Sequence, residues 1–179
     1  MLNKVKIAWW GKHFGEEPPL VGKANQGAGG IFFSGCHLLC VFCQNYQISQ
    51  ENLGREYLVE ELADIMLDLQ EQGAINIDLV TPTIWWRQIK QAILLARRKG
   101  LVLPIVWNSN GYEAIEILKE MDGLVDIYLP DFKYSDDELG YKYSGIKNYS
   151  IIAEKAIREM YRQVGNFKEE NGIGKRGLI

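Results

Sequence analysis

Three cysteines are the residues of this chain whose types and spacing most clearly suggest chemistry. Cys36, Cys40 and Cys43 lie in the segment SGCHLLCVFCQNYQ with the spacing C-x3-C-x2-C, and no other cysteine occurs in the 179 residues. Because their number is odd, they cannot all pair as disulfides within the chain. Thiolates are strong ligands for soft metals, so the spacing indicates a metal site.

Two kinds of metal site are compatible with three thiols. A structural zinc ion takes four ligands, and the chain offers only His13 and His37 as a nitrogen ligand. His37 adjoins Cys36, which would strain a tetrahedral site, and His13 lies in the N-terminal segment at an unknown distance. An iron–sulfur cubane normally takes four thiolates, so three would leave one iron with an open position. A small molecule with an amine and a carboxylate, such as S-adenosylmethionine, could chelate that iron.

Polar residues also follow each of three expected strands further along the chain. In parallel α/β folds, ligands bind at the carboxyl ends of the strands, where successive loops meet on one side. We therefore expect the polar groups to gather beside the cysteine loop. The groups are Thr81-Pro82-Thr83, Asn108-Ser109-Asn110 and Asp131-Phe132-Lys133.

Each of these groups also has an ordinary structural interpretation. Thr83 could be the N-cap of a helix, with Pro82 restricting the turn before it. The segment NSNG could be a turn that starts a helix. Asp131 and Lys133 could form an exposed ion pair that contributes little. Only their common placement after the strands favours a shared site.

The elements that must position these residues alternate between strands and helices. Four strand–helix units in strict alternation predict a parallel sheet with right-handed crossovers. The glycine-rich segment 27–30 lacks the context of a phosphate loop, and we expect it to be a flexible entry to the first strand. We expect strands at 31–35, 75–80, 103–107 and 125–129, and helices at 57–72, 84–100, 114–121 and 149–164.

The length of the chain limits how far this pattern can extend. A closed eight-stranded α/β barrel needs about 250 residues, and this chain ends with only a hint of another strand at Leu178 and Ile179. The strand at 125–129 would then lie at an edge with unpaired backbone groups. A second copy of the chain could pair with that edge.

Composition sets further bounds on location and partners. The hydrophobic content of 47% and the charged content of 24% are those of an ordinary globular protein. A net charge of -3 argues against nucleic acid as a partner, because there is no basic excess to neutralise phosphates. No segment reaches the roughly 18 to 20 apolar residues that cross a membrane, and the N-terminus does not resemble a signal peptide. We expect a cytoplasmic protein.

The cysteine motif resembles a known signature. C-x3-C-x2-C, with Phe42 just before the last cysteine and placed after the first strand, is similar to the motif of the radical SAM (S-adenosylmethionine) enzymes. Other segments resemble the PflX-type group, which is similar to the pyruvate formate-lyase activating enzyme, and this likeness runs from about Val5 to the last residue. The segments are HFGEEPPLVG, GGIFFSGCHLLCVFCQNYQISQ, LVTPTIWW, VWNSNGY and DIYLPDFKYSD.

The resemblance implies a fold and a set of site residues. The fold would be an α/β partial barrel of six βα units, of which this chain holds about four, with residues 1–30 as an N-terminal extension and 31–179 as an incomplete core. Cys36, Cys40 and Cys43 would hold a 4Fe–4S cluster, and Phe42 would pack near the adenine of S-adenosylmethionine. Further contacts to that molecule would come from Thr81, Thr83, Asn108, Ser109, Asp131 and Lys133.

The resemblance also implies an activity. The enzyme would cleave S-adenosylmethionine reductively, and the resulting radical would abstract hydrogen from an unknown substrate, which by analogy could be a glycine in a glycyl-radical enzyme. A reduced flavodoxin or ferredoxin would be the electron donor. This chain lacks the family's Gly-Gly-Glu segment, where Thr81-Pro82-Thr83 stands instead, and its last two strands. We therefore also expect weak S-adenosylmethionine affinity, and a non-catalytic remnant that binds iron–sulfur or zinc is the alternative.

Overall fold

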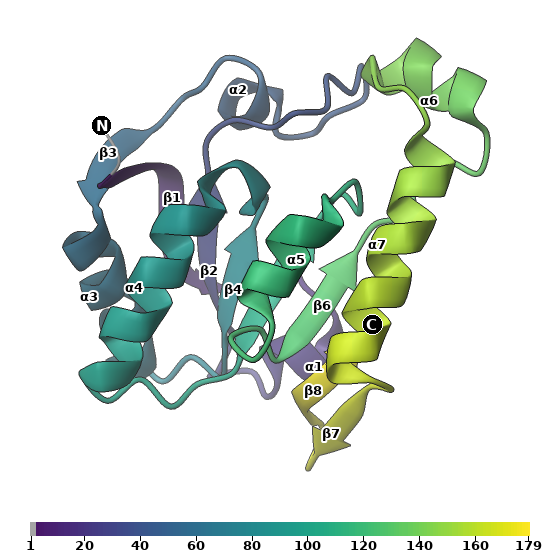
Figure 1. Ribbon diagram of the computed structural model, residues 1–179. Helices are drawn as coiled ribbons and strands as arrows, with labels where there is room; N and C mark the ends of the chain where they lie inside the picture. Colours follow the sequence, from purple (N-terminus) through teal and green to yellow (C-terminus); the bar gives the residue numbers. More distant parts are fainter. Residues whose placement is uncertain (1–2) are drawn as a thin grey trace.

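Eight strands form one mixed sheet in the computed structural model, which describes residues 3–179 (Figure 1). Their spatial order is β3-β1-β2-β4-β5-β6-β8-β7. The strands are β1 (Lys4–His13), β2 (Ala28–Phe33), β3 (Arg55–Leu58), β4 (Ile77–Val80), β5 (Ile105–Ser109), β6 (Ile127–Pro130), β7 (Lys168–Glu170) and β8 (Ile173–Leu178).

The middle of the sheet confirms the predicted parallel arrangement. Strands β2, β4, β5 and β6 pair side by side in parallel, with Ile31 opposite Leu79, Leu79 opposite Trp107, and Trp107 opposite Tyr128. These are the four strands that the sequence predicts. Because all four point the same way, their carboxyl ends lie along one edge of the sheet, where the cysteine loop also begins.

The N-terminal segment adds strands that the sequence analysis did not predict. Strand β1 pairs antiparallel with both β2 and β3, and its Val5 and Ile7 are buried. Strand β2 begins at Ala28, so the expectation of a flexible entry over residues 27–30 is wrong. Its glycines pair with β1 on one side and with β4 on the other.

The expectation of an unpaired strand at 125–129 is also wrong. Strand β8 runs parallel to β6, with Ile127 opposite Gly177 and Tyr128 opposite Leu178, and β7 folds back against β8. The edge strands of the described sheet are β3 and β7, and the sheet does not close. A partial barrel of six βα units therefore stays a prediction.

The large helices cover one face of the sheet, which is the face nearer the viewer in Figure 1. Four of them correspond to predicted helices, and α7 has the predicted bounds. Helix α3 starts two residues late because 55–58 forms a strand, and α6 was not predicted. The helices are α1 (Pro18–Val21), α2 (Tyr46–Ser49), α3 (Val59–Glu71), α4 (Trp86–Arg98), α5 (Ile115–Met121), α6 (Asp137–Ser144) and α7 (Tyr149–Val164), with a 3-10 turn, η1, at Thr83–Trp85.

Successive strand residues face opposite sides of the sheet, which gives the two faces different characters. The helix-covered face carries large apolar side chains such as Trp107 and Tyr128, which belong to the main core. The other face carries Phe32, Asp78 and Asn108 near its middle, and among the described helices only the short α1 packs on it, through Leu20. No helix among residues 3–179 is long and apolar enough to span a membrane.

Candidate functional site

The three cysteines lie in the loop that follows β2, and none forms a disulfide. The sulfur of Cys36 accepts hydrogen bonds from the backbone N–H of Leu38 and from Nδ2 of Asn110, both at 3.4 Å. Burial raises the pKa of the Cys36 thiol, while these two donors favour the thiolate. N–H donors aimed at a sulfur also suit a sulfur bound to metal, because they stabilise its negative charge.

The other two cysteines contact serine hydroxyls from the surrounding elements. Ser144 at the end of α6 donates to the Cys40 sulfur at 2.8 Å, and the sulfur of Cys43 lies 3.2 Å from the hydroxyl of Ser49 in α2. Figure 1 shows α2 and α6 at the upper edge of the molecule, on either side of the cysteine loop. The loop is therefore held from both sides by polar contacts to its thiols.

A cavity of about 420 Å³ opens between this loop and the carboxyl ends of the strands. It brings together groups that lie far apart in the sequence, as expected for the carboxyl edge of a parallel sheet. All three cysteines line it, and so do six of the seven other predicted site residues. Those six are Phe42, Thr81, Asn108, Ser109, Asp131 and Lys133.

The predicted residues in the cavity offer several kinds of contact to a ligand. The Lys133 ammonium lies 2.6 Å from Oδ2 of Asp131, so the cavity wall carries one charge of each sign. The Phe42 side chain is 55% exposed, and an open aromatic face beside polar groups suits stacking on a planar ring. Thr81 has a backbone φ of 57°, a left-handed conformation that is strained for a β-branched residue and that is often found at functional sites.

Thr83 does not join this cavity. Its hydroxyl points to the helix-covered side and donates to Oε1 of Glu113 at 2.7 Å. The interpretation of Thr83 as the N-cap of the following helix is wrong as well, since η1 and α4 begin after Pro82 and Trp85. Thr83 instead lines a second cavity of about 600 Å³ between α4, α5 and α7.

Neither histidine contacts the cysteine sulfurs. Nε2 of His37 lies 2.9 Å from the carbonyl oxygen of Tyr112, and burial lowers the pKa of this imidazole. His13 pairs with Glu16 on the face of the sheet opposite the large helices. Within residues 3–179, no three or more His, Cys, Asp or Glu side chains are close enough together, as they stand, to hold an ion.

The donor set nevertheless fits an iron–sulfur cluster in its chemistry. Three unpaired thiols line one cavity, and thiolate sulfur is the ligand that such clusters take. The second cavity, in contrast, has no cysteine in its lining. A cluster in this chain would therefore lie on Cys36, Cys40 and Cys43, on the side where Asn110 donates to sulfur.

Two residues outside the predicted ligand contacts also support the site. Asn110 donates to Cys36, and the hydroxyl of Tyr149 accepts from the Lys133 N–H at 2.9 Å. The same hydroxyl lies 2.7 Å from the Asn110 carbonyl oxygen and 2.8 Å from that of Asp131. Asn110 stood in the polar group after β5, but Tyr149 begins a distant helix, and no local pattern indicates that it reaches two strand ends.

Comparisons with known proteins agree with the cysteine motif. Residues 31–170 match the sequence family described as the radical SAM superfamily. Two uncharacterized proteins of Methanocaldococcus jannaschii, MJ0674 and MJ0808, are similar to this chain. MJ0674 is 34% identical over 152 residues, which cover 80% of this chain and 42% of that protein. MJ0808 is 29% identical over 111 residues, which cover 60% of this chain and 32% of that protein. The matched part of this chain thus spans less than half of either relative.

Proposed function

Because this chain belongs to the radical SAM superfamily, we propose that Cys36, Cys40 and Cys43 hold a 4Fe–4S cluster and that the protein cleaves S-adenosylmethionine reductively. When bound, the cluster supplies the electron that splits S-adenosylmethionine into methionine and a 5′-deoxyadenosyl radical, which takes a hydrogen atom from a C–H bond. The observation that carries this proposal is the shared cavity, which is lined by all three thiols and by six residues expected near S-adenosylmethionine.

The residues of the cavity would bind and orient S-adenosylmethionine. Asp131 and Lys133, which lie side by side, offer one charge of each sign to the polar groups of S-adenosylmethionine that do not bind the iron. Its adenine can stack on the exposed ring of Phe42, as the resemblance implies. The Asn108 side chain donates its Nδ2 to Glu16 at 3.2 Å, which leaves the amide oxygen as an acceptor for a ligand hydroxyl or amino group.

Anaerobic reconstitution with iron and sulfide tests the proposal. The wild-type chain should bind about four iron atoms, change its EPR spectrum when S-adenosylmethionine is added, and release 5′-deoxyadenosine when a reductant is supplied. The Cys43→Ala variant should lose the product, because the last iron ligand of the motif is gone. Folded protein that stays colourless, or that takes up a single zinc ion and no iron, would refute the proposal.

The second candidate is the non-catalytic remnant, and iron uptake without 5′-deoxyadenosine would support it. It is favoured by the absence of a ready ligand set among the described residues. For the active enzyme, we propose a reduced flavodoxin or ferredoxin as the electron donor. A glycine of a partner protein is one substrate candidate, carried by the resemblance to the activating enzymes alone.

A further inference from the structure

A second polar cluster lies on the face of the sheet opposite the large helices, next to the cysteine cavity. Nδ1 of His13 is 3.1 Å from Oε1 of Glu16, and the other oxygen of Glu16 accepts from Nδ2 of Asn108 at 3.2 Å. Asn108 also lines the cysteine cavity, so the two sites share a wall. Asp78 stands on this face one strand away, two residues before Val80, which pairs with Asn108.

The Asp78 carboxyl is buried without a partner. The residue has no exposed surface, and among the described residues no donor lies within hydrogen-bond geometry of either oxygen, although the nearby side chain of Asn108 favours the charged form. Burial raises the pKa of Asp78 well above its ordinary value, and the negative charge of Glu16 raises it further. Buried polar groups in proteins are almost always hydrogen-bonded, because leaving one unpaired is costly. An unpaired carboxyl at this place is therefore best explained as a group that receives a ligand.

The charges around Asp78 favour a positively charged ligand. Glu16 and Glu17 both add negative potential at this carboxyl. Within residues 3–179, His13 is the only basic side chain that contacts either Glu16 or Asp78. The neighbouring Lys12 turns away, since its ammonium binds the carbonyl oxygens of Asn25 and Gln72.

Three aromatic rings border the same place. Trp9, His13 and Phe32 meet edge to face, with ring centroids 5.4 to 6.1 Å apart. They lie over Gly30, where an added Cβ would come within 3.2 to 3.4 Å of all three residues, and Gly30 is the strand partner of Asp78. The ring of Trp9 is partly open to solvent at 44% exposure. Aromatic faces together with carboxylates form the usual environment for ammonium groups.

We propose that this cluster binds an organic cation, a protonated amine or quaternary ammonium group of the substrate, beside the cavity where hydrogen abstraction would occur. The binding chemistry follows from Glu16, Asp78 and the three rings, whereas calling the ligand the substrate rests on the proposed function. The cluster does not have the form of a metal site, because no three ligand side chains among residues 3–179 converge on one point.

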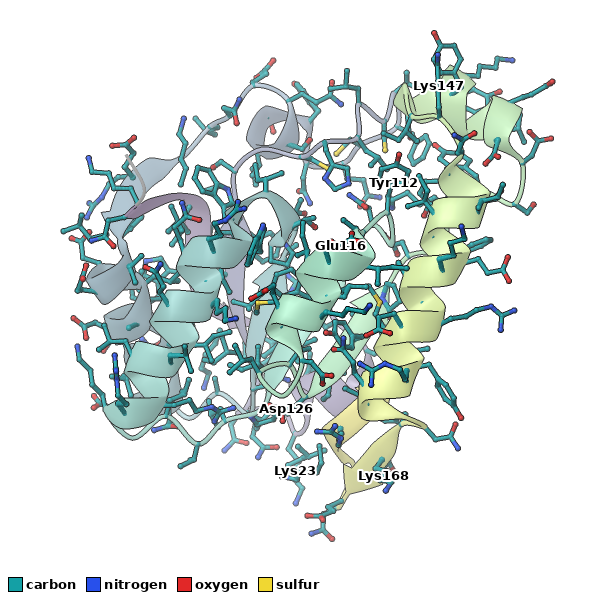
Figure 2. All side chains as sticks on the ribbon, viewed as in Figure 1. Lys23, Tyr112, Glu116, Asp126, Lys147 and Lys168 are labelled. Carbon is teal, nitrogen blue, oxygen red and sulfur yellow. The ribbon has the colours of Figure 1, made fainter. Side chains whose placement is uncertain are left out.

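Titrations of the full chain with small probes test this proposal. The NMR signal of the Trp9 indole N–H would report the binding of n-butylammonium, of 1-butanol as its neutral counterpart, and of Mn²⁺ alone. We expect n-butylammonium to bind at least tenfold more tightly than 1-butanol. Asp78→Asn and Glu16→Gln should each weaken n-butylammonium binding at least fivefold. Glu116→Gln should not, because Glu116 is exposed on α5, on the helix-covered side of the sheet (Figure 2).

Thermal unfolding of the same variants separates a binding role of Asp78 from a purely structural one, because the two roles predict opposite changes in Tm. Asp78→Asn should raise Tm, because it removes a buried carboxyl that has no partner. A lower Tm with unchanged n-butylammonium binding would show that Asp78 is structural. Equal binding of 1-butanol, or tighter binding of Mn²⁺ than of n-butylammonium, would overturn the organic-cation site.

The two proposals can fail separately. The titrations need neither cluster nor S-adenosylmethionine, so they can be run on the chain before and after reconstitution. Selective n-butylammonium binding by a chain that never releases 5′-deoxyadenosine would refute the proposed function and support the cation site. Release of 5′-deoxyadenosine by a chain that does not distinguish n-butylammonium from 1-butanol would refute only the cation site.

Discussion

The buried carboxyl of Glu113 should make the stability of this protein depend on pH. Its Oε1 accepts from Thr83 at 2.7 Å and from Nε1 of Trp107 at 3.1 Å, while Oε2 has no partner. Burial raises the pKa of Glu113 to about 6 from 4.5. The folded state therefore holds this proton more tightly than the unfolded chain, so its contribution is full below about pH 4.5 and is lost as pH rises through 6.

The Glu113→Gln variant should flatten this dependence. A shift from 4.5 to about 6 corresponds to about 2 kcal/mol of unfolding free energy lost by the wild type between pH 4.5 and 7.5. Urea unfolding of both proteins at several pH values measures this loss of unfolding free energy. Asp78 contributes in the same direction in both proteins, so the difference between the two curves belongs to Glu113. Parallel curves for wild type and variant would contradict the assignment.

Tyr149 should be the residue whose hydroxyl matters most to the cavity wall. The oxygen accepts from the N–H of Lys133 and lies close to the carbonyl oxygens of Asn110 and Asp131. Tyr149→Phe removes this partner from one buried and two part-buried backbone groups, which should cost roughly 1 to 3 kcal/mol of unfolding free energy. Faster hydrogen exchange at the Lys133 amide should accompany this loss of stability. Tyr141→Phe, at an exposed position of α6, should change neither quantity.

At the scale of elements, regular patterns were predictable and contacts between distant segments were not. The 3.6-residue repeat in the segment Tyr149–Val164 predicts a helix with its observed bounds. Helix α6 was missed because Gly140 and charged residues hide its pattern, although its N-cap Asp136 accepts hydrogen bonds from two backbone N–H groups. Only the end of strand β8 was indicated by the sequence, because its apolar residues are interrupted by Gly174, Lys175, Arg176 and Gly177.

The candidate site likewise contains residues that local patterns predict and residues that only distant contacts bring together. The cysteines and the residues after each strand were predictable, because a parallel sheet brings its strand ends to one edge. Thr83 was misplaced because it begins the 3-10 turn η1 instead of continuing the extended chain, and its hydroxyl donates to Glu113 on the helix-covered side. The cluster around Asp78 was missed because its members come from β1, the loop after it, β4 and β5. Only the register of the sheet brings them together.

The pairing of strand β8 with β6 can be tested at Gly177. Gly177 has a φ of 123°, and a Cβ there would lie 2.3 Å from the Phe167 Cα. Gly177→Ala should therefore disrupt the pairing of β8 with β6 and lower the unfolding free energy by about 2 to 4 kcal/mol. Gly172→Ala is the matched control, because its φ of 77° is also positive but no atom lies within 4 Å of the added Cβ. It should cost only about 1 kcal/mol. Equal losses in urea unfolding would contradict the steric explanation.

At the scale of the whole molecule, the cysteine loop connects parts of the fold that are otherwise far apart. Its thiols contact α2 through Ser49, α6 through Ser144, and the loop after β5 through Asn110. A cluster bound only by the folded chain would add its binding free energy to the stability of all these parts.

Anaerobic reconstitution should therefore raise Tm by about 5 to 10 °C, given tight binding and the size of this chain. Scanning calorimetry under argon measures the shift. Cys40→Ala, treated in the same way, should show no increase, and admitting oxygen to the wild-type sample should reverse it. An equal increase in wild type and variant would mean that iron stabilises the chain elsewhere.

Cys36 and His37 are consecutive residues that line different cavities, the first on the side of the strand ends and the second between the helices. The two cavities are thus lined by neighbouring residues at this point of the chain. Because Cys36 and His37 share a peptide bond, we expect a molecule bound between the helices against the His37 imidazole to constrain the backbone that carries the Cys36 thiol.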